Sequence, residues 1–168
     1  MSVQLDIQLA DNLSDSIEEP PPSSLLQTWA QIAWQGDSAQ PVNLSLRIVS
    51  AAESQQLNND YRGKNKPTNV LSFPMQLNEN IPMPEIMLGD LAICSEVVIN
   101  EASQQQKALQ SHWAHILIHG MLHLQGFDHV EDDEADKMEK LEIQIMQQLG
   151  FPNPYLNQIE KTSVTEIK

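Results

Sequence analysis

The chain has 168 residues, of which 40% are hydrophobic and 19% charged, a composition typical of one globular domain with a buried core. A single cysteine excludes an internal disulfide, and no segment has the run of about 18 apolar residues that a membrane-spanning helix needs. The net charge of −14 argues, taken as a whole, against a nucleic-acid partner. These features predict a cytoplasmic protein with no membrane partner.

The apolar pattern predicts four strands and four or five helices. Alternating residues and short apolar runs indicate strands over residues 3–9, 42–48, 68–75 and 87–94. Helical spacing and capping residues indicate helices over residues 23–33, 50–61 and 132–149. A further helix begins near residue 95, and a separate helix that carries the histidines ends near residue 126. Because strands and helices do not alternate strictly, we expect an α/β (α+β) fold in which helices pack on a mixed sheet of about four strands.

No linker is long enough to separate two domains, so we expect one compact domain over residues 1–152. Residues 76–86, which contain two prolines, indicate a mobile connection, and residues 153–168 indicate a flexible C-terminal tail. The acidic run over residues 131–134 is explained better by a helix start, where the helix dipole favours negative charge, than by a second metal site.

All five histidines lie within residues 112–129, and three of them have the spacing of a metal site. His119 and His123 stand one turn apart on the same face of a predicted helix. Gly126 has the backbone freedom to end that helix, and the turn brings His129 back toward the first two imidazoles. Three neutral imidazoles that leave a fourth position open are the usual ligands of a catalytic zinc. We therefore predict a metal-dependent hydrolase with one Zn²⁺ per chain.

Three further side chains lie close to these ligands in the sequence. His115, one turn before His119, is expected to support a ligand from behind or to pack in the core rather than to bind the metal. Asp128 is expected either to assist as a general base or to orient a ligand histidine. His112 is expected to be exposed.

The histidine stretch is similar to the H-E-x-x-H-x-x-G-x-x-H pattern of zinc proteases, so we expect a zincin-like histidine helix. Gly120, however, stands where those proteases have the glutamate that serves as general base, which disfavours a zinc peptidase. Glycine inside a helix costs about 1 kcal/mol relative to alanine. Two explanations are equally good: a group approaches the backbone there, or the helix packs closely on its neighbour.

Residues 61–74 are dense in groups that bind phosphate. Arg62 offers a planar fork of donors that matches phosphate oxygens. Further candidates for substrate contacts are two lysines and three neutral side chains: Lys64, Lys66, Thr68, Asn69 and Ser72. The alternative is a solvated basic turn that leads into a strand.

Acidic residues are absent from residues 61–78 and 102–127, although the whole chain has a net charge of −14. If these two segments meet in the fold, they form a neutral-to-positive cleft in an acidic protein. Such a cleft concentrates an anionic substrate that the rest of the surface repels.

The two segments together resemble the YbeY family of bacterial single-strand-specific endoribonucleases. The matching stretches are Leu57-Asn58, Tyr61 to Pro74, Leu88-Gly89-Asp90, His112 to His115, His119 to His129 and Glu131 to Ala135. The resemblance implies a compact α/β fold related to the zinc proteases, a zinc bound by His119, His123 and His129, and a catalytic arginine at Arg62. It also implies a role in rRNA maturation, at the 3′ end of 16S rRNA, and in ribosome quality control.

The expected partners are single-stranded RNA, including rRNA, and the ribosome or a ribosomal protein. In the expected mechanism a metal-activated water or the 2′-hydroxyl of the RNA attacks the phosphate, and Arg62 stabilises the charge that develops. A second class of function is a ribosome-associated assembly factor whose zinc is structural and whose effect is binding. The overall acidity of the chain suits docking on a basic ribosomal protein as well.

Overall fold

The computed structural model describes residues 3–11, 13, 19–37, 40–75, 84–128 and 130–156. Its elements follow the chain in the order β1 (Val3–Leu9), α1 (Ser23–Ala33), β2 (Val42–Val49), α2 (Ala51–Arg62), β3 (Val70–Pro74), β4 (Ile86–Cys94), α3 (Ser95–Gln104), α4 (Leu109–Leu124) and α5 (Asp132–Gln148). Each strand and helix predicted from the apolar pattern is present, most with ends within two residues. The expected mobile connection lies largely outside the described residues, which omit 76–83.

The four strands form one mixed sheet in the order β1-β2-β4-β3. β1 pairs parallel to β2, and β2 pairs parallel to β4, with Leu46 opposite Leu91. β3 joins β4 antiparallel, with Ser72 opposite Leu91, and therefore forms one edge of the sheet. The predicted α/β fold with a mixed sheet is confirmed.

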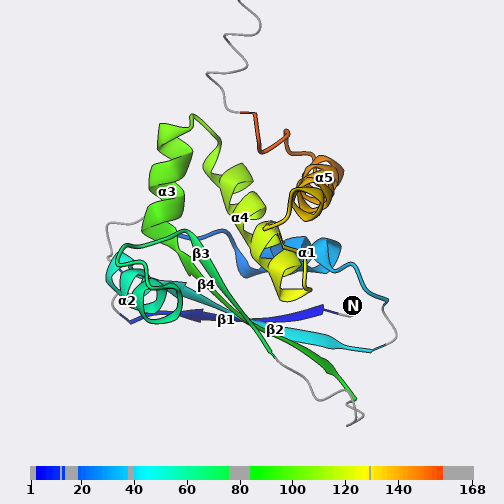
Figure 1. Ribbon diagram of the computed structural model, residues 1–168, viewed down its shortest axis with the longest axis horizontal. Coiled ribbons are helices and arrows are strands. Elements are labelled where there is room, and N and C mark those ends of the chain that lie inside the picture. Colours follow the sequence, from blue (N-terminus) through cyan, green and yellow to red (C-terminus); the bar gives the residue numbers. More distant parts are fainter. Residues whose placement is uncertain are drawn as a thin grey trace, which may run out of the picture.

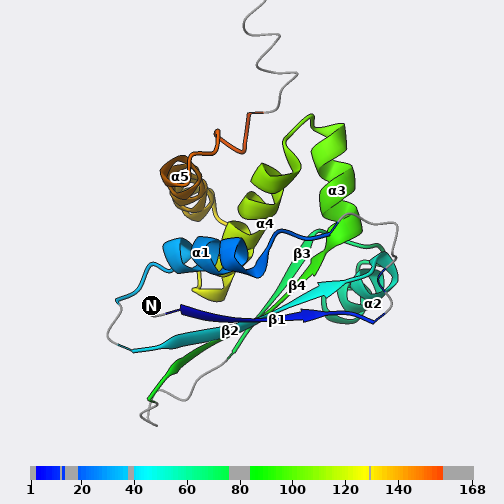
Figure 2. The same ribbon diagram turned by 180° about the vertical axis from the view of Figure 1, so that it is seen from behind.

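Helices cover both faces of the sheet unequally (Figures 1 and 2). Side chains alternate between the two faces of a strand, and β4 uses both sides. Leu91 and Ile93 of β4 lie in the large core beneath α1, α4 and α5. Ala92 and Cys94 lie in a small second cluster that Leu57 of α2 covers. As a result α2, with Arg62 at its end, lies across the sheet from the other helices.

α4 is the central helix and is buried along most of its length. Its residue Gly120 faces the sheet, where an added Cβ would lie 2.8 Å from Cδ2 of Leu91 and 3.2 Å from Cγ2 of Val70. Close helix packing therefore explains this glycine, and the alternative of an approaching ligand is not needed. Although α4 is strongly apolar, neither it nor another helix in the described ranges is long and apolar enough to cross a membrane.

The segment after α5 contacts the domain. Phe151 packs edge-on against Trp29 of α1, with 5.9 Å between ring centroids. Pro154 is buried, and the Lys107 ammonium donates a hydrogen bond to its carbonyl. In the expected flexible tail over residues 153–168, Pro154 and Tyr155 thus contact the domain, while residues 157–168 lie outside the described ones.

Replacing Gly120 with glutamate, the residue of the zinc-protease pattern, is expected to lower the free energy of unfolding by about 3 kcal/mol or more. The substitution forces extra atoms against Leu91 and brings a carboxylate to the helix–sheet contact. Urea denaturation of the variant measures the loss. Gln110→Glu, at an exposed position of the same helix, is the control and changes stability by less than about 0.5 kcal/mol. Equal stability of the two variants would contradict the packing role of Gly120.

Candidate active site

Two of the predicted metal ligands converge on one turn of α4. The Nε2 atoms of His119 and His123 lie 3.1 Å apart. Two nitrogen ligands of a tetrahedral zinc ion, each about 2.0–2.1 Å from the metal, are roughly 3.4 Å apart. The pair therefore has nearly the spacing that a shared metal ion requires. The third predicted ligand, His129, lies outside the described residues.

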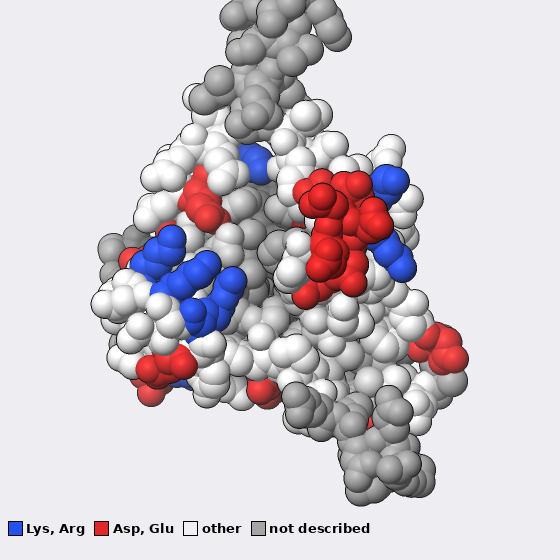
Figure 3. Space-filling view, in the orientation of Figure 1, with Lys and Arg blue, Asp and Glu red and all other residues white. Residues whose placement is uncertain are grey.

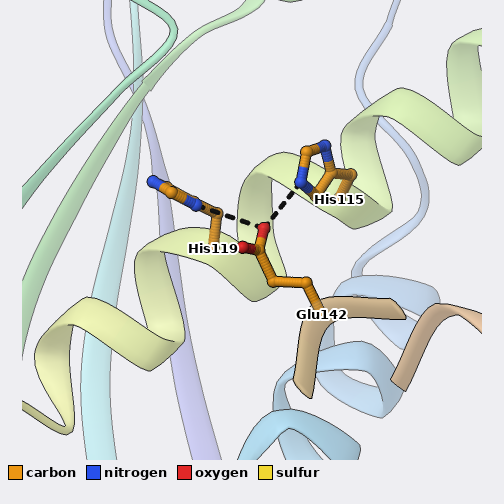
Figure 4. Close-up of side chains that lie close together, drawn as sticks. All are labelled: His115, His119 and Glu142. Atoms are coloured by element: carbon orange, nitrogen blue, oxygen red, sulfur yellow. Dashed lines mark hydrogen bonds and ion pairs between the residues drawn. The ribbon is translucent and has the colours of Figure 1, made fainter. Parts of the chain in front are cut away.

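The proton position on His119 follows from a carboxylate that the sequence analysis did not identify. Nδ1 of His119 lies 3.2 Å from Oε2 of Glu142, which comes from α5 (Figure 4). A carboxylate oxygen only accepts, so Nδ1 carries the proton and donates it. The lone pair of His119 is then on Nε2, the nitrogen that faces His123. Histidine ligands of protein metals are commonly held in this way by a carboxylate behind them.

Glu142 is a buried negative charge with three hydrogen-bond donors. Its side chain is 1% exposed. Besides His119, it accepts from Nε2 of His115 at 2.6 Å and from the Tyr155 hydroxyl at 2.6 Å. Burial alone would raise the pKa of Glu142, but the hydrogen bonds from His115 and His119 outweigh it and lower the pKa to about 2. The carboxylate is therefore ionised at neutral pH and places a fixed negative charge behind His119.

His115 lies behind the histidine pair and is mostly buried, with its side chain 13% exposed. Burial is the main cause that lowers its pKa, and the hydrogen bond to Glu142 opposes that shift. His115 is therefore neutral at neutral pH, with its proton on Nε2. It acts as a donor to Glu142 and shares that carboxylate with His119 (Figure 4).

A second metal arrangement is built from the same residues. Ligand atoms of His115, His119 and Glu142 all lie within 4.8 Å of one another, as a metal site requires. His119 would take part in this group through the nitrogen that faces Glu142, and in the first arrangement through the nitrogen that faces His123. The group with Glu142 is enclosed, because Tyr155 occupies the other carboxylate oxygen. The His119–His123 pair instead lines an open pocket.

That pocket has a volume of about 780 Å³ and joins the two segments that the sequence analysis singled out. The predicted site residues that line it are Arg62, Thr68, Asn69, Ser72, His119, His123 and Asp128. Lys64 and Lys66 do not line the pocket but are exposed on the loop that follows α2. The two segments without acidic residues do therefore meet, and Asp128 is the one acidic residue among the described residues of the wall.

The surface around the pocket is electrostatically one-sided. Basic side chains gather on the α2 side of the hollow, and acidic side chains gather on the α5 side (Figure 3). The first turn of α5 contributes Asp132, Asp133 and Glu134 to the acidic side. The cleft is thus positive along one rim only, whereas the sequence suggested a neutral-to-positive cleft throughout.

Polar residues of α2 hold the basic loop in place. Nδ2 of Asn58 donates to the Lys66 carbonyl at 2.8 Å. The Ser54 hydroxyl accepts from the backbone N–H of Thr68 at 2.9 Å and donates to its carbonyl at 3.0 Å. Both side chains are buried. These contacts hold the backbone of Lys66 and Thr68 without a substrate, with Thr68 at the pocket wall.

Asn69 and His112 share the carboxylate of Glu101 on α3. Nδ2 of Asn69 donates to Oε1 of Glu101 at 3.1 Å, and Nε2 of His112 lies 2.9 Å from the same oxygen. Burial alone would raise the pKa of Glu101, but hydrogen bonds from His112 and Asn69 lower it. The expectation that His112 is exposed is wrong, since it is 4% exposed. Its ring is covered because α3 packs on that face of α4.

The pocket brings two histidines and an arginine to one hollow of the α/β fold, and comparison with known proteins gives the family. Residues 8–150, nearly the whole chain, match the model of the family described as Endoribonuclease YbeY. The chain belongs to this family of endoribonucleases, which implies an RNA substrate.

A solved structure agrees with the fold. The solution structure of TM1509 from Thermotoga maritima superposes with a TM-score of 0.53 at 23% sequence identity. The match covers 92% of this chain and 100% of that one. At this identity the likeness supports the arrangement of strands and helices only.

Asn58→Ala is expected to lower the free energy of unfolding by about 1–2 kcal/mol, because the Lys66 carbonyl loses its donor and a buried side chain is removed. Thermal or urea denaturation measures the change. The neighbouring exposed Asn59→Ala is the matched control and should behave like the wild type. A similar loss in both variants would contradict the role of the Lys66 contact, because alanine raises helix propensity at both positions.

Proposed function

We propose that the chain is a zinc-dependent endoribonuclease that cleaves single-stranded RNA in the cytoplasm. It acts in rRNA maturation, including the 3′ end of 16S rRNA, and in ribosome quality control. The observation that carries the proposal is that His119 and His123 share one pocket with Arg62, in a member of an endoribonuclease family. Such a pocket suits a phosphodiester, since it offers nitrogen ligands for a cation and a guanidinium for phosphate oxygens.

The proposed zinc ligands are His119, His123 and His129. Imidazole nitrogens suit zinc, and the spacing of the first two fits a tetrahedral ion. Zinc bound there would supply Lewis-acid activation of water or of a phosphoryl oxygen. Glu142 keeps the Nε2 lone pair of His119 directed into the pocket, and His115 steadies Glu142 from the side. Both act on the ligand from outside the pocket.

The remaining pocket residues have proposed roles toward RNA. Arg62 stabilises the negative charge that grows on the phosphate in the transition state. Thr68, Ser72 and Asn69 contact the substrate, and Asn69 does so with its carbonyl oxygen and its second amide hydrogen, because Glu101 takes the first. Lys64 and Lys66 attract phosphates along the basic rim in a salt-dependent manner.

Asp128 is exposed at the pocket wall and either accepts a proton or orients a ligand histidine. The ends of the RNA products distinguish the two nucleophiles. A 2′,3′-cyclic phosphate identifies the 2′-hydroxyl of the RNA as the attacking group, and its absence from the earliest products identifies water.

Peptide hydrolysis is disfavoured by position 120. Besides lacking a carboxylate, Gly120 faces Leu91 and Val70 of the sheet. A ribosome-associated assembly factor is the other alternative, and the acidic side of the cleft suits a basic ribosomal protein as its partner. Bound zinc without chelator-sensitive RNA cleavage would favour the assembly factor.

His119→Ala and His123→Ala are each expected to lose the zinc ion and to reduce cleavage of a single-stranded RNA by 100-fold or more, on the order expected for losing the activating metal. Zinc content and cleavage are measured on the same samples. His112→Gln is the control that keeps zinc, because His112 belongs to neither metal arrangement. A His123→Ala variant that retains zinc would contradict the proposed ligands and favour the enclosed group of His115, His119 and Glu142.

Arg62→Ala is expected to lower kcat by about 100-fold or more while weakening RNA binding much less, because its charge acts mainly on the transition state. Single-turnover cleavage and equilibrium binding separate the two effects. Lys64→Ala, outside the pocket on the loop that follows Arg62, should weaken binding in a salt-dependent manner with little change in kcat. Equal changes in kcat for the two variants would mean that Arg62 only helps RNA to dock.

A further inference from the structure

The C-terminal segment returns to α4 beside the turns that carry His115 and His119. Gly150, with φ of 87°, turns the chain after α5, and Figure 1 shows the following residues running from α5 toward the start of α4. The Lys107 ammonium, just before α4, donates to the Pro154 carbonyl. Tyr155 comes next and lies against His115, with ring centroids 5.4 Å apart in an edge-on contact.

The Tyr155 hydroxyl completes the set of donors around Glu142. It donates to Oε1 at 2.6 Å, while both imidazoles donate to Oε2. Burial, together with the Glu142 carboxylate, raises the pKa of Tyr155, so the phenol stays protonated and remains a donor. Donors on both oxygens fix the plane of the carboxylate. If donors were present on Oε2 alone, the carboxylate would be free to rotate.

The bond to His119 depends most on that orientation. At 3.2 Å it is longer than the bond from His115 to the same oxygen, at 2.6 Å. A carboxylate that rotates toward a new donor for Oε1 would therefore keep His115 and lose His119. Without an acceptor for Nδ1–H, the His119 proton has no reason to stay on that nitrogen, and the lone pair is no longer held on Nε2.

We propose that Tyr155 is a positioning residue of the metal site, which acts through Glu142 to keep the Nε2 lone pair of His119 available to the metal. The inference rests on the proposed zinc site and extends it to the segment after residue 152. That segment is then part of the catalytic unit rather than a tail.

The test compares Tyr155→Phe with wild type in the full chain. Phenylalanine keeps the ring contact with His115 and removes only the hydroxyl. Zinc affinity, measured by competition with a chelator, is expected to fall about tenfold, the lower end for residues that support a metal ligand. In the metal-free protein, nitrogen NMR above the ordinary pKa of histidine is expected to show a smaller Nδ1–H fraction for His119.

Phe151→Leu is the matched control in the same segment. Phe151 packs on Trp29 and has no side-chain group that can hydrogen-bond to Glu142, so its loss is expected to lower stability while zinc affinity and the His119 tautomer stay as in wild type. Equal losses of zinc affinity in both variants would overturn the proposal, because the segment would then act only by general stabilisation. Wild-type zinc affinity together with a wild-type tautomer in Tyr155→Phe would also overturn it.

A double-variant cycle tests whether Tyr155 acts through Glu142. In a Glu142→Gln background, Tyr155→Phe is expected to cause little further loss of zinc affinity. A full additional tenfold loss would contradict the route through Glu142. The tautomer measurement needs neither zinc nor RNA, so its outcome is independent of whether the proposed ribonuclease activity is found.

Discussion

The close approach of α4 to the sheet is the constraint on which the rest of the structure depends. Gly120 allows the helix to lie against Leu91 and Val70. His119 and His123, on the adjacent face of the same helix, line the pocket. A side chain at position 120 would move the helix away from β3, whose residues form the opposite wall of the pocket. The packing of the core and the geometry of the pocket therefore depend on each other, because the same part of α4 contributes to both.

A buried charge supports the site from behind. Taking a carboxylate out of water is costly unless donors replace the solvent, and Glu142 meets this requirement with two imidazoles and a phenol. The arrangement links three parts of the chain, α4, α5 and the segment that follows it. Stability alone does not account for a charge held in this way, since replacement of buried ion pairs by apolar residues is often neutral or favourable. The Glu142 carboxylate instead has a functional role, because it accepts a hydrogen bond from His119, which lines the pocket.

The charges around the pocket favour one orientation of a polyanion. Arg62, Lys64 and Lys66 lie on the α2 side, and the acidic first turn of α5 lies on the other (Figure 3). A single RNA strand can place its phosphates along the basic rim and keep them away from α5. The net charge of −14 is thus compatible with an RNA substrate, because attraction is local and the remaining surface repels nonspecific contacts.

The sequence by itself determined the elements of the fold and the part of the site that is local in the chain. Apolar periodicity is a property of neighbouring residues, so it predicted the strands, the helices and the mixed sheet. The four-residue spacing likewise put His119 and His123 on one face of a helix. Tertiary structure alone decided the partners that are distant in the chain. Glu142 and Tyr155 reach the histidines from beyond α4, Glu101 covers His112, and Ser54 and Asn58 hold the basic loop. Those contacts depend on how helices pack, which short-range spacing does not specify.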